Sequence, residues 1–95
     1  MNVRPHNHRE REDWPPPRVV MTADQIREAY AEGRRDFYYV VADGEDFSNI
    51  DLTGASLLGA SLVETSFQHA QLTNVQLKMA NLTGAFLVGA GINGI

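Results

Sequence analysis

Residues 45 to 94 decide the fold and read EDFSN IDLTG ASLLG ASLVE TSFQH AQLTN VQLKM ANLTG AFLVG AGING. These are ten consecutive units of five residues, with no insertion between them. The first residue of each unit is mostly small or β-branched, and Glu45 is the exception. A fixed period of this kind is typical of repeat architectures, in which each unit repeats one local structure. The third residue of each unit, called the centre here, is always large and apolar: Phe47, Leu52, Leu57, Leu62, Phe67, Leu72, Leu77, Leu82, Leu87 and Ile92.

A period of five fits neither an α-helix nor a flat strand. On an α-helix, five residues advance about 140° beyond a full turn, so the centres would be scattered around the cylinder. On a flat strand, side chains alternate with period two, so centres five residues apart would point to opposite faces in turn. All ten centres can point inward together only if the chain turns a corner once in every unit.

Glycine supplies these corners at the fifth position of many units. Six of the eight glycines lie two residues after an apolar inward residue, and Asn49 and Asn74 occupy the same position in other units. Glycine and asparagine tolerate the backbone angles that tight turns require. We therefore expect the first and third residues of a unit to face inward, and the second and fourth to face outward.

These units resemble the pentapeptide-repeat family, whose motif is roughly A(D/N)LxG. The resemblance implies an all-β solenoid, a right-handed quadrilateral β-helix with four units and twenty residues in each coil. Phe47, Phe67 and Leu87 would then form one inward column. The register also extends backward through Phe37, which predicts about three coils over residues 35–95. The charged residues Arg35 and Glu45 at inward positions indicate an imperfect first coil.

A short helix precedes the repeats and is expected to close their N-terminal end. Thr22 and Gln25 have the spacing of a capping box, and Gly33 marks the helix end. We predict a helix over residues 23–32 within a helical N-terminal cap over residues 19–34. The preceding residues 1–18 are polar and rich in proline, which favours a disordered tail.

The last repeats have no visible cap and carry unusual outward residues. Phe86 and Val88 are apolar at positions where Ser, Asn and Thr are the norm. Exposed apolar clusters usually mark contact surfaces. We predict a symmetric homodimer in which the two C-terminal ends cover each other. The alternatives are that later coils are missing from this chain, or that Phe86 folds over the last coil. The predicted interface consists of Phe86, Leu87, Val88, Ile92 and Ile95.

A second, weaker candidate surface lies on the side walls. Leu58 and Val63 occupy the outward fourth position of neighbouring units, and Tyr38 and Lys78 share a column with Leu58. Tyr38, Leu58 and Val63 form the predicted side-wall patch for a protein partner. Single exposed apolar residues are common, however, and need no functional cause.

Composition narrows the classes of partner and chemistry. The chain has 12 acidic and 8 basic residues, a net charge of -4. This balance disfavours binding to nucleic acid or to an anionic membrane. The chain has no cysteine, no secretory signal and no segment long enough to span a bilayer. We therefore expect a soluble cytoplasmic protein.

No group of residues has the pattern of a catalytic or metal site. His69 is a lone corner histidine, Asp46 and Asp51 are outward acids, and His6 and His8 lack a third ligand. We expect no cofactor, no metal and no small-molecule substrate. The preferred function is a non-enzymatic structural or protein-interaction module.

The resemblance also suggests an alternative function, a DNA-mimic inhibitor of a type II topoisomerase. Such a mimic would need a long rod with continuous acidic columns. Only four acidic residues fall within the ten units quoted above. An enzyme would need a clustered polar pocket, which a filled β-helix core does not offer.

Overall fold

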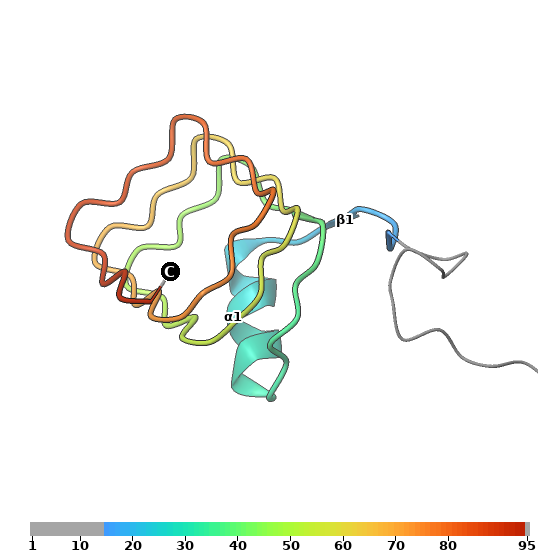
Figure 1. Ribbon diagram of the computed structural model, residues 1–95, viewed down its shortest axis with the longest axis horizontal. Helices are drawn as coiled ribbons and strands as arrows, with labels where there is room; N and C mark the ends of the chain where they lie inside the picture. The colour runs from blue at the N-terminus through green and yellow to red at the C-terminus, as the bar shows by residue number, and fades with distance from the viewer. Residues whose placement is uncertain (1–14, 95) are drawn as a thin grey trace, which may run out of the picture.

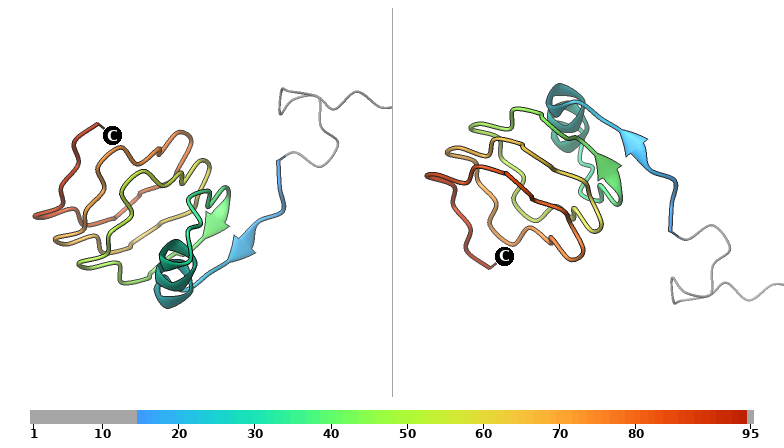
Figure 2. Two further views of the ribbon diagram at one scale, coloured as in Figure 1. Left: turned by 90° about the horizontal axis from the view of Figure 1, so that it is seen from below. Right: turned by 90° about the horizontal axis from the view of Figure 1, so that it is seen from above.

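The computed structural model describes residues 15–94. Its regular elements are strand β1 (Val19–Val20), helix α1 (Ala23–Ala31) and strand β2 (Val40–Val41). The remaining chain winds into coils joined by parallel bridges between residues twenty positions apart, such as Asp36 with Ser56 and Ser56 with Gln76. The coils stack on one another, and α1 lies at the end of the stack away from the last coil (Figure 1, Figure 2). We call residues 35–54, 55–74 and 75–94 the first, middle and last coil.

A corner follows each inward centre. The fifth residue of every unit has a positive φ, whether it is glycine, as at Gly54 (φ 76°), or a larger residue, as at His69 (φ 61°). Most units then begin with an N–H that donates to the carbonyl of the preceding centre, as Ala55 does to Leu52 at 2.9 Å. At Thr65 the side-chain hydroxyl makes this contact with Leu62. These hydrogen-bonded turns point successive centres inward.

The interior is filled by the first and third residues of the units. Leu57 and Leu62 are 1% and 0% exposed, so centres five residues apart face the same core. Phe47 and Phe67 stack with their ring centroids 4.9 Å apart. The buried hydroxyl of Thr65 donates to the carbonyl of Leu62 at 2.9 Å, so this polar group is satisfied within the core.

Outward residues at the second position stabilise the turn within their own unit. The carboxylate of Asp51 accepts hydrogen bonds from the N–H of Thr53 at 3.0 Å and from its hydroxyl at 2.7 Å. Asn81 makes the same pair of contacts with Thr83 in the last coil. Short side chains with an oxygen acceptor are favoured in such turns, which explains the frequent Ser, Asp and Asn at this position.

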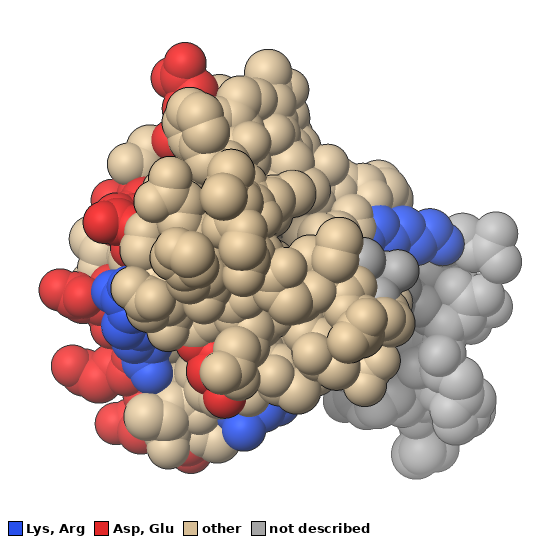
Figure 3. All heavy atoms as spheres, turned by 90° about the vertical axis from the view of Figure 1, so that its left-hand side faces the viewer, with Lys and Arg blue, Asp and Glu red and all other residues tan. Residues whose placement is uncertain are grey.

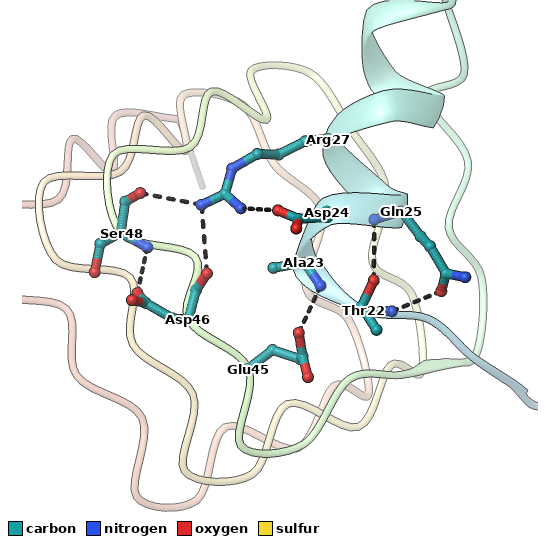
Figure 4. Close-up of polar contacts among 8 residues, drawn as sticks. All are labelled: Thr22, Ala23, Asp24, Gln25, Arg27, Glu45, Asp46 and Ser48. Atoms are coloured by element: carbon teal, nitrogen blue, oxygen red, sulfur yellow. Dashed lines mark hydrogen bonds and ion pairs between the residues drawn. The ribbon is translucent and has the colours of Figure 1, made fainter.

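The N-terminal end is covered by α1 and edged by β1. The capping box of Thr22 and Gln25 is present, and α1 runs from Ala23 to Ala31 (Figure 4). Ile26 is fully buried against the core. Strand β1 pairs in parallel with β2, with Val19 opposite Val40. The helix was expected from the sequence, whereas this strand was not.

Residues 19–34, which contain β1 and α1, are called the covering segment. Two charged residues at inward positions of the first coil both contact this segment. Glu45 accepts a hydrogen bond from the N–H of Ala23 at 2.7 Å. The guanidinium of Arg35 lies 3.6 Å from the ring centroid of Tyr30 and donates to its carbonyl at 2.9 Å. The departures from the repeat pattern therefore lie where the first coil meets the covering segment.

Candidate interaction surface at the last coil

The last coil exposes side chains that are buried elsewhere in the stack. Leu87 is 41% exposed and Ile92 is 49% exposed, although both occupy the centre of a unit. The equivalent Phe67, twenty residues before Leu87, is 1% exposed. The difference arises because, within residues 15–94, no further coil or helix covers this end of the stack.

Outward residues extend this apolar surface around its rim. Phe86 is 58% exposed and Val88 is 67% exposed. The structure therefore brings Phe86, Leu87, Val88 and Ile92 to one end of the molecule, and Ile95 lies outside the described residues. We call these four described residues the end surface.

Sequence reasoning missed one exposed apolar residue of the last coil. Met79, which belongs to the last coil, is 70% exposed. It occupies a corner, with φ 62°, where glycine or asparagine is common in the other units. A large apolar side chain at a corner position was the signal that could have identified it.

Charge is nearly absent from the middle and last coils. Glu64 and Lys78 are the only acidic and basic residues in the sequence from 55 to 94. Figure 3 views the side on which the last coil lies, where acidic and basic residues lie along the edge and the middle carries no charged residue. The middle of this face is therefore apolar and uncharged.

The side-wall residues are less prominent than the end surface. Tyr38, Leu58 and Val63 are each half-buried. The backbone N–H of Val63 donates to the carboxylate of Asp43 at 2.8 Å, so Val63 shares its column with an acid rather than with Tyr38. Leu58 and Val63 lie on adjacent walls. The side-wall patch stays a prediction.

Several outward carboxylates are held in their charged form. The pKa of Asp43 is lowered by a hydrogen bond from the Ser61 hydroxyl and by the backbone N–H of Val63. The pKa of Asp51 is lowered in the same way by the hydroxyl and the N–H of Thr53. Both carboxylates are exposed acceptors in turns, and neither lies in an enclosed pocket.

Cavities in the described part of the chain lie near its N-terminal end. One of about 220 Å³ lies between the segment before β1 and the first coil, and a more open one of about 470 Å³ lies beside the start of α1. Among residues 15–94, no group of three or more His, Asp or Glu side chains is placed to hold a metal ion. His69 is exposed at its corner, while His6 and His8 lie outside the described residues. No helix within residues 15–94 is long and apolar enough to cross a membrane.

Comparisons with known proteins agree with the repeat pattern. Residues 46–84 match the family model of pentapeptide repeats, in 8 copies. The solved structure of Rfr23, a pentapeptide repeat protein from the cyanobacterium Cyanothece 51142, aligns with 61% of this chain at 22% identity and a TM-score of 0.60. The alignment covers 40% of the Rfr23 chain, so this likeness bears on the fold alone.

Two further solved structures superpose less well. The pentapeptide repeat protein alr5209 from Nostoc Pcc 7120 is 21% identical, with 78% of this chain and 97% of that chain covered and a TM-score of 0.33. HetL from Nostoc sp. strain PCC 7120, described as involved in heterocyst differentiation regulation, is 26% identical, with 78% and 42% covered and a TM-score of 0.25. No significant match was found among curated proteins.

Proposed function

The chain belongs to the pentapeptide-repeat family, and on this premise we propose that it is an interaction module that acts by contact rather than by catalysis. Proteins of this family fold as right-handed quadrilateral β-helices and are generally structural or interaction modules. The observation that carries the proposal is the end surface, where Leu87 and Ile92 present core positions to solvent.

The proposal includes the finer architecture. We take residues 35–94 as three coils and the segment over residues 19–34 as the cap of their N-terminal end. The parallel bridges between residues twenty positions apart and the burial of Ile26 support this arrangement. Within residues 15–94 the stack then has one covered end and one end that exposes core positions, and the second end is the proposed binding surface.

A second copy of the chain is the proposed occupant of the end surface. Phe86, Leu87, Val88 and Ile92 lie at one end of the coil stack, and burying them against the same patch of a second copy would remove this apolar area from water. The scarcity of charge in residues 55–94 supports close contact between two such ends, because few like charges would face each other. We keep a cytoplasmic location as part of the proposal.

Sedimentation velocity over a range of protein concentrations tests this function. The wild-type chain should show a monomer–dimer equilibrium, and Phe86→Glu should shift it toward monomer. Gln68→Glu is a matched control, because Gln68 is an exposed outward residue of the middle coil, and it should leave the equilibrium unchanged. A wild-type chain that stays monomeric at the highest concentration would contradict self-association.

DNA mimicry of the kind that inhibits a type II topoisomerase is the alternative proposal, and the charge distribution does not favour it. The acidic residues of the coils are concentrated in the first coil, and Glu64 is the single acid between residues 55 and 94. A continuous acidic column along the stack is therefore missing from the middle and last coils. Inhibition of DNA supercoiling at stoichiometric protein concentration would reverse this preference.

A further inference from the structure

The hydrogen bonds between coils have a direction. Twelve backbone hydrogen bonds join the first coil to the middle coil, and the first coil donates eight of them. The N–H groups of Phe47 and Asn49, for example, donate to the carbonyls of Ser66 and Gln68, while the N–H of Ser66 donates back to Glu45. The middle and last coils are joined by the same eight-to-four pattern. Each coil therefore presents mainly N–H donors to the coil that follows it.

The last coil consequently ends in an excess of donors. Its acceptors on that side are only the carbonyls of Val75, Ala80, Ala85 and Ala90, which accept no hydrogen bond within residues 15–94. Its donors outnumber them two to one. The backbone N–H groups that find no acceptor within residues 15–94 are those of Leu77, Met79, Leu82, Gly84, Leu87, Gly89, Ile92 and Gly94.

At the N-terminal end of the stack, the unpaired backbone groups of the first coil find hydrogen-bond partners in the covering segment. The first coil presents mainly carbonyls there, and the covering segment meets them with donors. The guanidinium of Arg27 donates to the carbonyls of Asp46 and Ser48, both at 3.3 Å, as Figure 4 shows. The hydroxyl of Tyr30 donates to the carbonyl of Thr53 at 2.8 Å.

Two further carbonyls of the first coil are met in the same way. The guanidinium of Arg34 donates to the carbonyl of Asp36 at 2.8 Å. The backbone N–H of Met21, next to β1, donates to the carbonyl of Val41 at 3.0 Å. Every one of these contacts pairs a donor from the covering segment with an acceptor of the coil.

We infer that the end surface is built to receive the carbonyl-rich starting edge of another β-helical coil. This inference rests on the proposed function, because it names the partner class of the same surface. A coil that follows in parallel would accept from all eight N–H groups and donate to all four carbonyls, as the middle and last coils already do. Its inward side chains would also cover Leu87 and Ile92.

In a symmetric dimer, two end surfaces would face each other. Fewer backbone N–H groups would then find an acceptor than against a parallel coil. Each copy brings eight donors and four acceptors, so half of the donors can be paired directly if each carbonyl accepts one hydrogen bond, as it does between the coils. A buried N–H group without a partner costs free energy. The N–H groups left without an acceptor in the dimer would therefore need water between the copies. A further β-helical coil in parallel is therefore the tighter occupant, and it competes with the second copy for the end surface.

Amide hydrogen exchange measured by NMR tests this inference. The full chain is extended after Ile95 by a copy of residues 56–75, which continues the five-residue register through one more coil. The exchange of all eight amides of the last coil should slow about a hundredfold or more. It should reach the protection of their equivalents in the middle coil, such as Leu57 and Leu62. A matched control carries the same twenty residues in an order without the period, and should leave these amides fast.

The wild-type chain provides the second measurement. At concentrations where it pairs, no more than four of the eight amides in each copy should gain protection. Protection of more than four in a symmetric pair would overturn the inference, and so would fast exchange of the eight amides in the extended chain. If the wild-type chain never pairs, the proposed self-association fails, and the extended chain still decides the inference.

Discussion

The rings of Phe47 and Phe67 stack with their centroids 4.9 Å apart and their planes 10° from parallel. They are separated by twenty residues, and both are 1% exposed. The distance between the rings is close to the spacing of neighbouring strands, so the coil spacing itself places one ring above the other. One column of the core therefore contains an aromatic stack, and Leu87 occupies the next position of the same column.

Phe67→Ala should destabilise the protein by about 3 to 5 kcal/mol, because it removes a buried ring and leaves a cavity between two coils. Phe67→Leu, which copies the residue found one coil later in the same column, should cost less. Urea unfolding followed by circular dichroism measures both. Gln68→Ala serves as the control, since Gln68 is an exposed outward residue beside Phe67 and its loss should change the free energy of unfolding by about 0.5 kcal/mol or less.

Gly59→Ala should destabilise the protein more than Gly54→Ala. Both glycines have positive φ, 67° and 76°, so alanine is strained at each by about 1 to 2 kcal/mol. A β-carbon at Gly59 would also collide with the ring of Tyr39, whereas the space beside Gly54 is open. We expect a further loss of about 1 to 3 kcal/mol at Gly59.

The collision at Gly59 can be separated from the strain by a second substitution. In a Tyr39→Gly background, which removes the ring, Gly59→Ala should cost no more than Gly54→Ala. An equal loss at both glycines in the wild-type background would show that Tyr39 moves aside freely.

The pH dependence of stability should include a share from Asp51. Its pKa is lowered from the ordinary value of 3.8 by hydrogen bonds from the hydroxyl and N–H of Thr53. A lowered folded-state pKa means that this stabilisation is present above the unfolded pKa and is lost as the pH falls through the folded value. The melting temperature should therefore fall between pH 5 and strongly acidic pH.

Asp51→Asn should reduce this acid dependence and keep the turn intact. Asn81 already makes the equivalent contacts with Thr83 through an uncharged amide. The difference in melting temperature between wild type and Asp51→Asn should shrink as the pH falls below the ordinary value. Asn81→Asp is the reciprocal variant and should gain acid dependence of the same sign. An unchanged pH profile in Asp51→Asn would contradict the assignment.

Tyr30→Phe should destabilise the protein by about 0.5 to 1.5 kcal/mol. The variant keeps the ring that faces Arg35 but removes the hydroxyl that donates to the carbonyl of Thr53 at 2.8 Å. Chemical denaturation measures the loss. A free energy of unfolding equal to that of wild type would show that water satisfies the Thr53 carbonyl equally well.

The period of five predicted the inward direction of the centres because it depends only on the geometry of the chain. Leu57 and Leu62 face one core, and Thr22 with Gln25 begins α1, as the sequence indicated. Strand β1 was missed because a strand of two residues has no periodicity. Its only signal is that Val19 and Val20 repeat as Val40 and Val41 twenty-one residues later.

The end surface was only partly accessible to sequence reasoning. Phe86 and Val88 were identifiable because they break a polar pattern. The exposure of Leu87 and Ile92 depends on which coil is last, and their residue types are the same as those of buried centres. The direction of the backbone hydrogen bonds carries no residue signature, since every unit shares it. That property is visible only in the folded structure.

The twenty-residue register couples chain length to orientation. Each five-residue unit forms one side of the coil, so inserting one unit between α1 and Phe86 would rotate everything after it by about a quarter turn around the stack axis. Inserting four units would restore the original angle and move the two ends apart by one strand spacing. Inserting or deleting five-residue units, in evolution or by design, could therefore set the angle between the two ends of the stack without altering a contact within a unit.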